Sequence, residues 1–243
     1  MKSKNKLIIE ITVKGIGYLI ILSIYCLGMD FFPLEATVNT GDRSGNQTDL
    51  SETIKVPEGN GKPVLLDGIF SPGEWEDARK IDINQNVDLF IKKYQGHVFI
   101  GVKTTPYKTF VVDLFISPNG KTIHHLHTSA QICERLVHEN SGPWDNPSFI
   151  YGYSKDWYAN EIRWDNEKMQ ELINKGKSRN EAQEMSYFKY DGYEFQIKQS
   201  KFPSDQWLLR IEVPISPEWD KPVIFPSGTE MTSTKGWIRL EWD

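Results

Sequence analysis

The chain has 243 residues, which is enough for one domain with appendages and for a substantial hydrophobic core. Aromatic residues make up 12% of the sequence, with 8 Trp and 10 Tyr, which is a high share for a soluble domain. The formal net charge is −5, and this balance argues against a nucleic-acid-binding protein, which needs a basic stripe.

The first 36 residues have the pattern of an export signal. Several lysines precede a short apolar run at 15–29, and the small residue Ala36 follows a few positions later. The run is shorter than the roughly 20 residues of a membrane-spanning helix. We therefore expect residues 1–36 to be a secretory signal peptide that directs the protein to the cell envelope or outside the cell. An uncleaved anchor, or a lipid attached at Cys26 despite the bulky Tyr25 before it, would tether the protein to a membrane instead.

Residues 37–62 predict a flexible linker. They are rich in Thr, Gly, Asn, Ser, Asp and Glu, and they contain no aromatic residue, so they cannot bury a core of their own. The boundary with the folded domain is expected at Pro63, and that domain runs to Asp243.

From Pro63 onward the sequence predicts short strands separated by turns. Alternating apolar and polar residues at 87–92 and 97–103 predict two half-buried strands joined by a tight turn at residues 94–96. Further strands are expected at 64–66, 110–117, 193–199, 207–213 and 236–242, with one strand or a pair within 122–136. The predicted fold class is all-β, an antiparallel β-sandwich of jelly-roll or immunoglobulin-like type.

A polar segment at about 165–188 interrupts this pattern and predicts two short helices. Asp165 is a suitable cap for a first helix that ends near Gly176, and Ser178 with Glu181 forms a capping box for a second. We expect a small helical insertion that lies on the sandwich with a solvated charged face.

The stretch 64–78 contains a turn at Asp67-Gly68, a second break at residues 71–73, and Trp75 shortly afterwards. A large ring between a break and a small residue, Ala78, predicts a plug at one end of the sandwich. Core packing is the first role expected of this ring.

This stretch resembles the opening motif of the family 9 carbohydrate-binding module-like domains, a group related to DOMON domains. The matching residues are Asp67, Gly68, Gly73, Glu74, Trp75 and Ala78, and later strands match at Val98, Phe99, Ile100, Val102, Trp207, Glu212 and Pro214. The resemblance spans roughly 63–243, with the helical insertion as a departure. It implies a carbohydrate-binding β-sandwich of the kind often joined to enzymes of carbohydrate catabolism. The related DOMON domains sometimes hold haem.

Residues 141–164 combine many aromatic side chains with Pro, Gly, Asn and Asp in an irregular chain. Exposed rings stack on the C–H faces of sugars, while amides, carboxylates and guanidinium groups bind the hydroxyls. Local composition alone gives as candidates the rings of Trp144, Trp157 and Trp164 and the polar side chains of Asn146, Asp156, Asn160 and Arg163. The alternative for each ring is that it packs a loop onto the sandwich.

A His-rich stretch at 124–127 is the most reactive-looking feature of the sequence. On a strand, His125 and His127 share one face about 7 Å apart, so they could bind a metal ion with a third ligand, or one of them could be an axial ligand of haem. The alternative is a hydrogen-bonded polar pair without a metal ion.

No sequence motif of a catalytic nucleophile or zinc protease is present, and no pair of carboxylates has a defined spacing. Cys133 is the cysteine that remains after signal removal, and we expect a buried, inert thiol. The sequence therefore predicts a non-catalytic carbohydrate-binding module without a cofactor. A haem- or metal-binding electron-transfer domain that uses His125 or His127 is the alternative.

Overall fold

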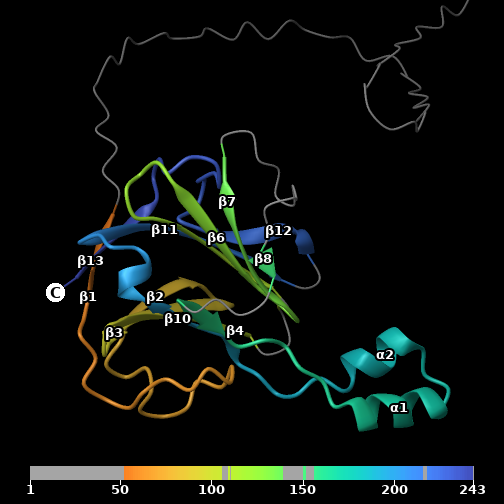
Figure 1. The fold of residues 1–243 in the computed structure, drawn as a ribbon. Coiled ribbons are helices and arrows are strands. Elements are labelled where there is room, and N and C mark those ends of the chain that lie inside the picture. Colours follow the sequence, from red (N-terminus) through yellow and green to blue (C-terminus); the bar gives the residue numbers. More distant parts are fainter. Residues whose placement is uncertain are drawn as a thin grey trace, which may run out of the picture. The chain divides into compact units, whose positions relative to one another are not determined.

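The computed structural model describes residues 52–105, 109, 111–138, 150–151, 156–215 and 218–242. The predicted signal peptide and most of the predicted linker lie outside them. In the described part, two β-sheets pack face to face as a sandwich, which confirms the predicted fold class (Figure 1). No helix of this part is long and apolar enough to cross a membrane.

The larger sheet has eight strands. Its order is β1 (Thr53–Val56), β13 (Ile238–Trp242), β11 (Gln206–Ile215), β5 (Val112–Ser117), β6 (Ile123–Thr128), β7 (Ile132–Val137) and β8 (Ile150–Tyr151), and β12 (Glu218–Phe225) also pairs with β11. The β1–β13 pair is parallel, and the other pairs in this sheet are antiparallel.

The smaller sheet has five strands, and each pair of neighbouring strands in it is antiparallel. Its order is β2 (Arg79–Asn84), β3 (Val87–Tyr94), β4 (His97–Thr104), β10 (Gly192–Lys198) and β9 (Trp157–Ala159). A short 3-10 helix, η1 (Gln199–Lys201), follows β10. The turn predicted between β3 and β4 is confirmed, because Gln95 and Gly96 both have positive φ angles, 49° and 75°.

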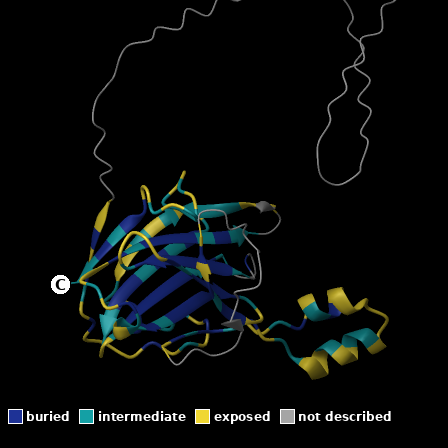
Figure 2. Ribbon diagram, turned by 45° about the horizontal axis from the view of Figure 1, so that its top comes forward, coloured by how far each residue is buried: buried dark blue, intermediate teal, exposed yellow. Residues whose placement is uncertain are grey.

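The main core lies between the two sheets and consists of alternate residues on the facing strands (Figure 2). Leu89 and Ile91 of β3 and Leu114 and Ile116 of β5 are fully buried there. Burial of these aliphatic side chains is the dominant source of stability in a sandwich of this kind.

The predicted helices are confirmed, but their packing differs from the prediction. The first, α1 (Asn166–Asn174), is capped by Asp165, and the second, α2 (Arg179–Glu184), carries the predicted capping box. The α1 helix buries no residue and α2 buries Ala182 alone, and both helices are largely exposed in Figure 2. The insertion therefore does not cover a face of the sandwich.

Two predictions for the N-terminal side of the domain are wrong. Residues 64–66 are not a strand, because the chain here runs across the outer face of the smaller sheet, with Leu65 exposed. The predicted linker, conversely, contains strand β1, whose Ile54 and Val56 are buried in the main core. The sandwich therefore begins before Pro63.

Trp75 is buried, as expected, but it does not plug an end of the sandwich. It packs with Val64, Phe90 and Phe99 in a separate apolar cluster. Phe90 alternates along β3 with the inward-facing Leu89 and Ile91, so this cluster covers the outer face of the smaller sheet.

Candidate functional site

The Asp-Gly turn at Asp67 and Gly68 is held by a residue on a distant strand. The side chain of Glu194 on β10 accepts hydrogen bonds from the Gly68 N–H at 2.9 Å and the Asp67 N–H at 3.2 Å. Its other oxygen accepts the indole N–H of Trp75 at 3.0 Å. Glu194 therefore joins the turn and the tryptophan of the motif to the smaller sheet.

The chain leaves this sheet after β9 and returns to it at β10. Asn160, directly after β9, holds the two ends of this excursion together. Its side-chain oxygen accepts the N–H of Glu194 at 2.6 Å, and its side-chain nitrogen donates to the Gly192 carbonyl at 3.2 Å. The Gly68 carbonyl accepts the N–H of Asp191 at 2.6 Å on the return segment. Three segments distant in sequence are thereby locked together by buried hydrogen bonds.

A cleft of about 220 Å³ opens where these three segments meet. We call it the turn cleft, and it is lined by Leu66, Asp67, Tyr158, Asn160, Glu161, Ile162, Arg163, Phe188, Lys189 and Tyr190. Phe188 is 55% exposed, which is high for a ring of this size. The Arg163 side chain is also exposed, with its guanidinium group 3.8 Å from Glu161.

Two of the predicted sugar-binding side chains, Asn160 and Arg163, line the turn cleft. Trp164 follows directly in the chain. It is half-buried, its ring meets that of Tyr187 edge-on at a centroid distance of 6.2 Å, and its indole N–H donates to Asn166 at 3.0 Å. The amide of Asn160 is buried and already occupied by backbone groups, so its role in the cleft is structural.

Trp157 does not have the exposed ring that the sequence suggested. It is 3% exposed, its ring stacks on that of Phe195 in the main core, and its indole N–H donates to Glu134 at 2.8 Å. Residues 157–159 form β9, an edge strand of the smaller sheet, and the side chain of Trp157 points from this strand into the main core. Asp156 is exposed beside it and pairs with Lys198 at 3.4 Å. Trp144 and Asn146 lie outside the described residues.

Local composition did not single out most of the residues that line the cleft, among them Tyr158, Phe188 and Lys189. Phe188 ends the segment predicted as the polar insertion, although tyrosines lie on both sides of it at 187 and 190. An aromatic cluster directly after a helix and before a strand was the available signal.

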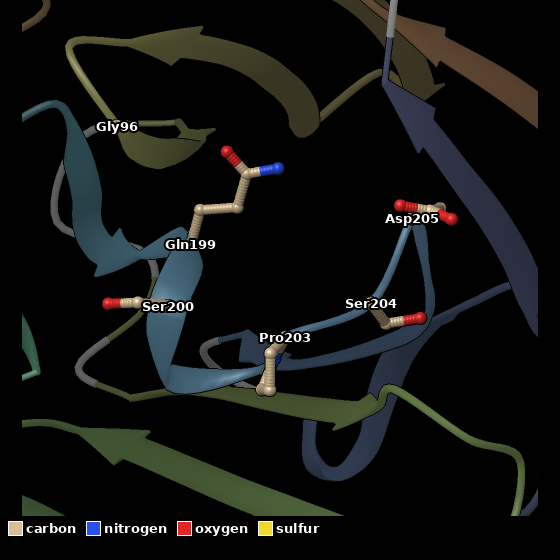
Figure 3. A pocket seen from close by; sticks show the side chains of 6 residues that line it. All are labelled: Gly96, Gln199, Ser200, Pro203, Ser204 and Asp205. Carbon is tan, nitrogen blue, oxygen red and sulfur yellow. The ribbon is translucent and has the colours of Figure 1, made fainter.

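A second, more open groove of about 660 Å³ lies next to η1. Its lining residues are Gly96, Gln199, Ser200, Pro203, Ser204 and Asp205. Figure 3 shows the Gln199 side chain on one side of the opening and Asp205 on the other. None of these six residues carries an aromatic ring, so the groove lacks the stacking surface that a sugar needs.

The two candidate metal ligands lie together on β6, and β5 adds a third group. Asp113 is paired with His127 in the ladder between these strands. One oxygen of Asp113 lies 2.7 Å from Nε2 of His125 and 2.7 Å from Nδ1 of His127. All three side chains are buried, and their potential ligand atoms lie within 4.8 Å of one another.

The hydrogen bonds assign the protons in this cluster. Arg135 on β7 donates to Nδ1 of His125 at 2.9 Å, and a guanidinium group cannot accept a hydrogen bond. His125 therefore carries its proton on Nε2 and donates it to Asp113. Burial opposes ionisation of Asp113, but hydrogen bonds from His125 and His127 outweigh burial and lower its pKa to about 2. Burial lowers the pKa of His125, which favours the neutral ring.

These assignments fit a hydrogen-bonded cluster better than a metal or haem site. A zinc-bound histidine normally donates its second ring N–H to an acceptor, whereas Arg135 places a donor at that position of His125. Both ring nitrogens of His127 also have partners, Asp113 and Ser129. An axial bond to haem would have to break one of these contacts. Cys133, opposite His127 on β7, is buried, and burial raises its thiol pKa to about 11.

Comparison with known proteins gives little further guidance. No family model matches the chain, and no curated protein matches it. Among solved structures it is similar to a "putative carbohydrate-binding protein" from Bacteroides uniformis, at 9% identity and a TM-score of 0.37, covering 79% of this chain and 99% of the other.

Proposed function

We propose that this protein binds carbohydrate in the turn cleft. The observation that carries the proposal is Phe188, a large ring left 55% exposed in the wall of a cleft whose floor is fixed by buried hydrogen bonds. An exposed ring in a preformed site lowers the cost of binding, because neither the ring nor the floor has to be rearranged.

The side chains around Phe188 are suited to sugar hydroxyls. Arg163 and Lys189 supply donors, while Asp67 and Glu161 supply acceptors. Apolar C–H groups of a sugar ring can pack on Phe188 at the same time. This mixture of one flat apolar surface and several polar groups is typical of small-molecule sites.

The size of the cleft bears on the ligand. At about 220 Å³ it is below the range of about 300–1,000 Å³ for sites that enclose drug-sized molecules. We therefore expect it to hold one sugar residue, such as the end of a chain. Affinity is expected to be modest, because each sugar hydroxyl exchanges a hydrogen bond with water for one with the protein.

Export to the cell envelope or outside the cell is part of the same proposal. It is supported by the basic and apolar pattern of residues 1–36, with a membrane tether as one form of it. A sugar-binding domain in that location would meet extracellular polysaccharides. Protease protection of the intact cell's protein, before and after membrane permeabilisation, tests this localisation.

A glycan array probed with the full-length protein tests the binding proposal. We expect signal for a limited set of sugars, reduced in the variants Phe188→Ala and Arg163→Ala. Leu136→Ala and Arg179→Ala are matched controls, because they remove an exposed apolar and an exposed basic side chain elsewhere. Equal loss in variants and controls, or no signal for any sugar, would contradict the proposal.

A further inference from the structure

Ser129 lies in the turn between β6 and β7, and it completes a chain of three side chains. It is half-exposed, and its Oγ lies 3.1 Å from Nε2 of His127. The other nitrogen of that ring, Nδ1, lies 2.7 Å from Asp113, which is buried. A serine, a histidine and an aspartate thus follow one another in the geometry used for nucleophilic catalysis by serine.

The hydrogen bonds between Asp113, His127 and Ser129 suit nucleophilic catalysis by the serine. Asp113 is ionised, so it accepts the N–H of His127 at Nδ1. In the tautomer with its proton on Nδ1, His127 presents Nε2 as an acceptor to the Ser129 hydroxyl. Among the described residues, the Ser129 hydroxyl has one alternative acceptor, the Gln131 carbonyl at 3.3 Å, which is farther away than His127. The shorter contact places the hydroxyl proton on the path to the imidazole.

We propose that Ser129 is a nucleophile for ester hydrolysis, with His127 as its general base. Asp113 orients His127, and His125 holds Asp113 from the other side while Arg135 fixes the tautomer of His125. Asp113, His125 and Arg135 are positioning residues in this arrangement. The assignment runs against the expectation from sequence motifs, because Ser129 lies in a β-turn rather than in a strand–turn–helix elbow.

A donor for the developing oxyanion lies next to the nucleophile. Ala130 is exposed, and its backbone N–H makes no hydrogen bond to any residue in the described part of the chain. The N–H of the residue after the nucleophile is one of the donors that stabilise a tetrahedral intermediate in other serine esterases.

The reaction is balanced without a cofactor. The Ser129 oxygen attacks the ester carbonyl carbon as its proton passes to His127, and the carbonyl oxygen becomes the oxyanion. The bond from carbon to the alcohol oxygen then breaks, and His127 returns the proton to that oxygen. Water attacks the acyl-serine in the same way, which releases the carboxylic acid and restores Ser129.

The position of Ser129 suggests a class of ester, and this part rests on the proposed function. The Ser129 carbonyl accepts the N–H of Ile162 at 3.0 Å, and Thr128 donates to the Asn160 carbonyl at 2.8 Å. Ile162 and Asn160 both line the turn cleft. The backbone of Ser129 and the side chain of Thr128 are therefore hydrogen-bonded to the segment that forms the cleft wall, which places Ser129 next to this segment, and an acyl ester of a sugar is the expected substrate.

A fluorophosphonate probe applied to the full-length protein tests the nucleophile directly. We expect one covalent adduct, located on the peptide that contains Ser129 by mass spectrometry. The adduct should disappear in Ser129→Ala, which removes one oxygen from an exposed turn and preserves the fold. Ser200→Ala, a change at an exposed serine outside this cluster, should keep it.

Hydrolysis of p-nitrophenyl acetate supplies the second readout. The rate should fall at least tenfold in Ser129→Ala and in His127→Gln. A folded wild-type protein without adduct or hydrolysis would overturn the proposal. If the adduct forms but no sugar binds, Ser129 remains the proposed nucleophile, and a sugar ester is no longer its expected substrate.

Discussion

Gly68 and Glu194 are 126 positions apart in the chain, yet the Gly68 N–H donates to the Glu194 carboxylate at 2.9 Å in a buried site. This bond fixes the Asp67-Gly68 turn against strand β10. The same carboxylate accepts the Trp75 indole N–H, so the turn and the tryptophan both depend on one residue of that strand.

Glu194 should make stability depend on pH. Burial is the main cause that raises its pKa, from 4.5 to about 7, while the hydrogen bonds from Trp75 and Gly68 oppose the shift. Because the folded-state pKa lies above the unfolded one, its contribution is fully present below pH 4.5 and is lost as the pH rises through about 7. We expect a decrease of about 1–3 kcal/mol in the free energy of unfolding over this range.

Urea unfolding at pH 4.5, 6 and 8 measures this effect, with Glu194→Gln as the reference. The glutamine variant keeps the shape of the side chain but does not titrate. The difference between the two proteins isolates Glu194 from other groups. Parallel curves for wild type and variant would show that the carboxylate does not titrate in this range.

Lys92 is a buried lysine on β3 whose hydrogen bonds stabilise the fold. It is 0% exposed, and its ammonium group donates to the Glu74 carbonyl at 2.6 Å, to Asp77 at 2.8 Å and to the Lys62 carbonyl at 3.2 Å. It therefore links the motif loop to strand β3. Lys92→Met leaves these oxygens without a donor, and we expect a loss of about 3–5 kcal/mol in unfolding free energy.

Lys80→Met is the control for Lys92→Met, since Lys80 forms exposed ion pairs with Asp82 and Asp88. Exposed pairs contribute little to stability, because solvent screens their charges. Thermal unfolding of both variants should thus show a large decrease in Tm for Lys92→Met alone. Similar small changes in both would mean that Lys92 is not a structural link.

Much of the fold followed from local patterns. The alternation in β3 and β4, the Asp165 cap and the capping box at Ser178 are short-range features, and each was predicted within one or two residues. The sequence patterns did not predict β1, β2, β8, β9 or β12, and for β1 and β9 the pairing depends on partners that are distant in the chain. For example, Thr53 pairs with Arg239, and Trp157 pairs with Ile197.

The candidate site was harder to predict, because exposure is a tertiary property. Trp157 and Phe188 are both aromatic residues near polar ones in the sequence, but a strand buries the first and a connecting segment exposes the second. The position of Asp113 beside His125 and His127 likewise depends on the register between β5 and β6. The pair of histidines was visible in the sequence, but its partner was not.

The cluster of Asp113, His125 and His127 should behave as a hydrogen-bonded unit. We expect EDTA, or added Zn²⁺ or Co²⁺, to change Tm by less than about 1 °C, since a ligand that binds the native state tightly would raise it. Protein from a haem-replete host should show no Soret band. A stoichiometric bound metal with a raised Tm, lost in His127→Gln, would establish a metal site instead.

Isothermal titration with the sugar that gives the strongest array signal measures the contribution of Phe188 to binding. We expect Phe188→Ala to weaken binding roughly 2- to 12-fold, in line with about 0.5–1.5 kcal/mol for an aromatic stacking contact. Leu136→Ala, at a site that is 41% exposed on β7, should bind like the wild type. Unchanged affinity in a folded Phe188→Ala variant would contradict a glycan site in the turn cleft.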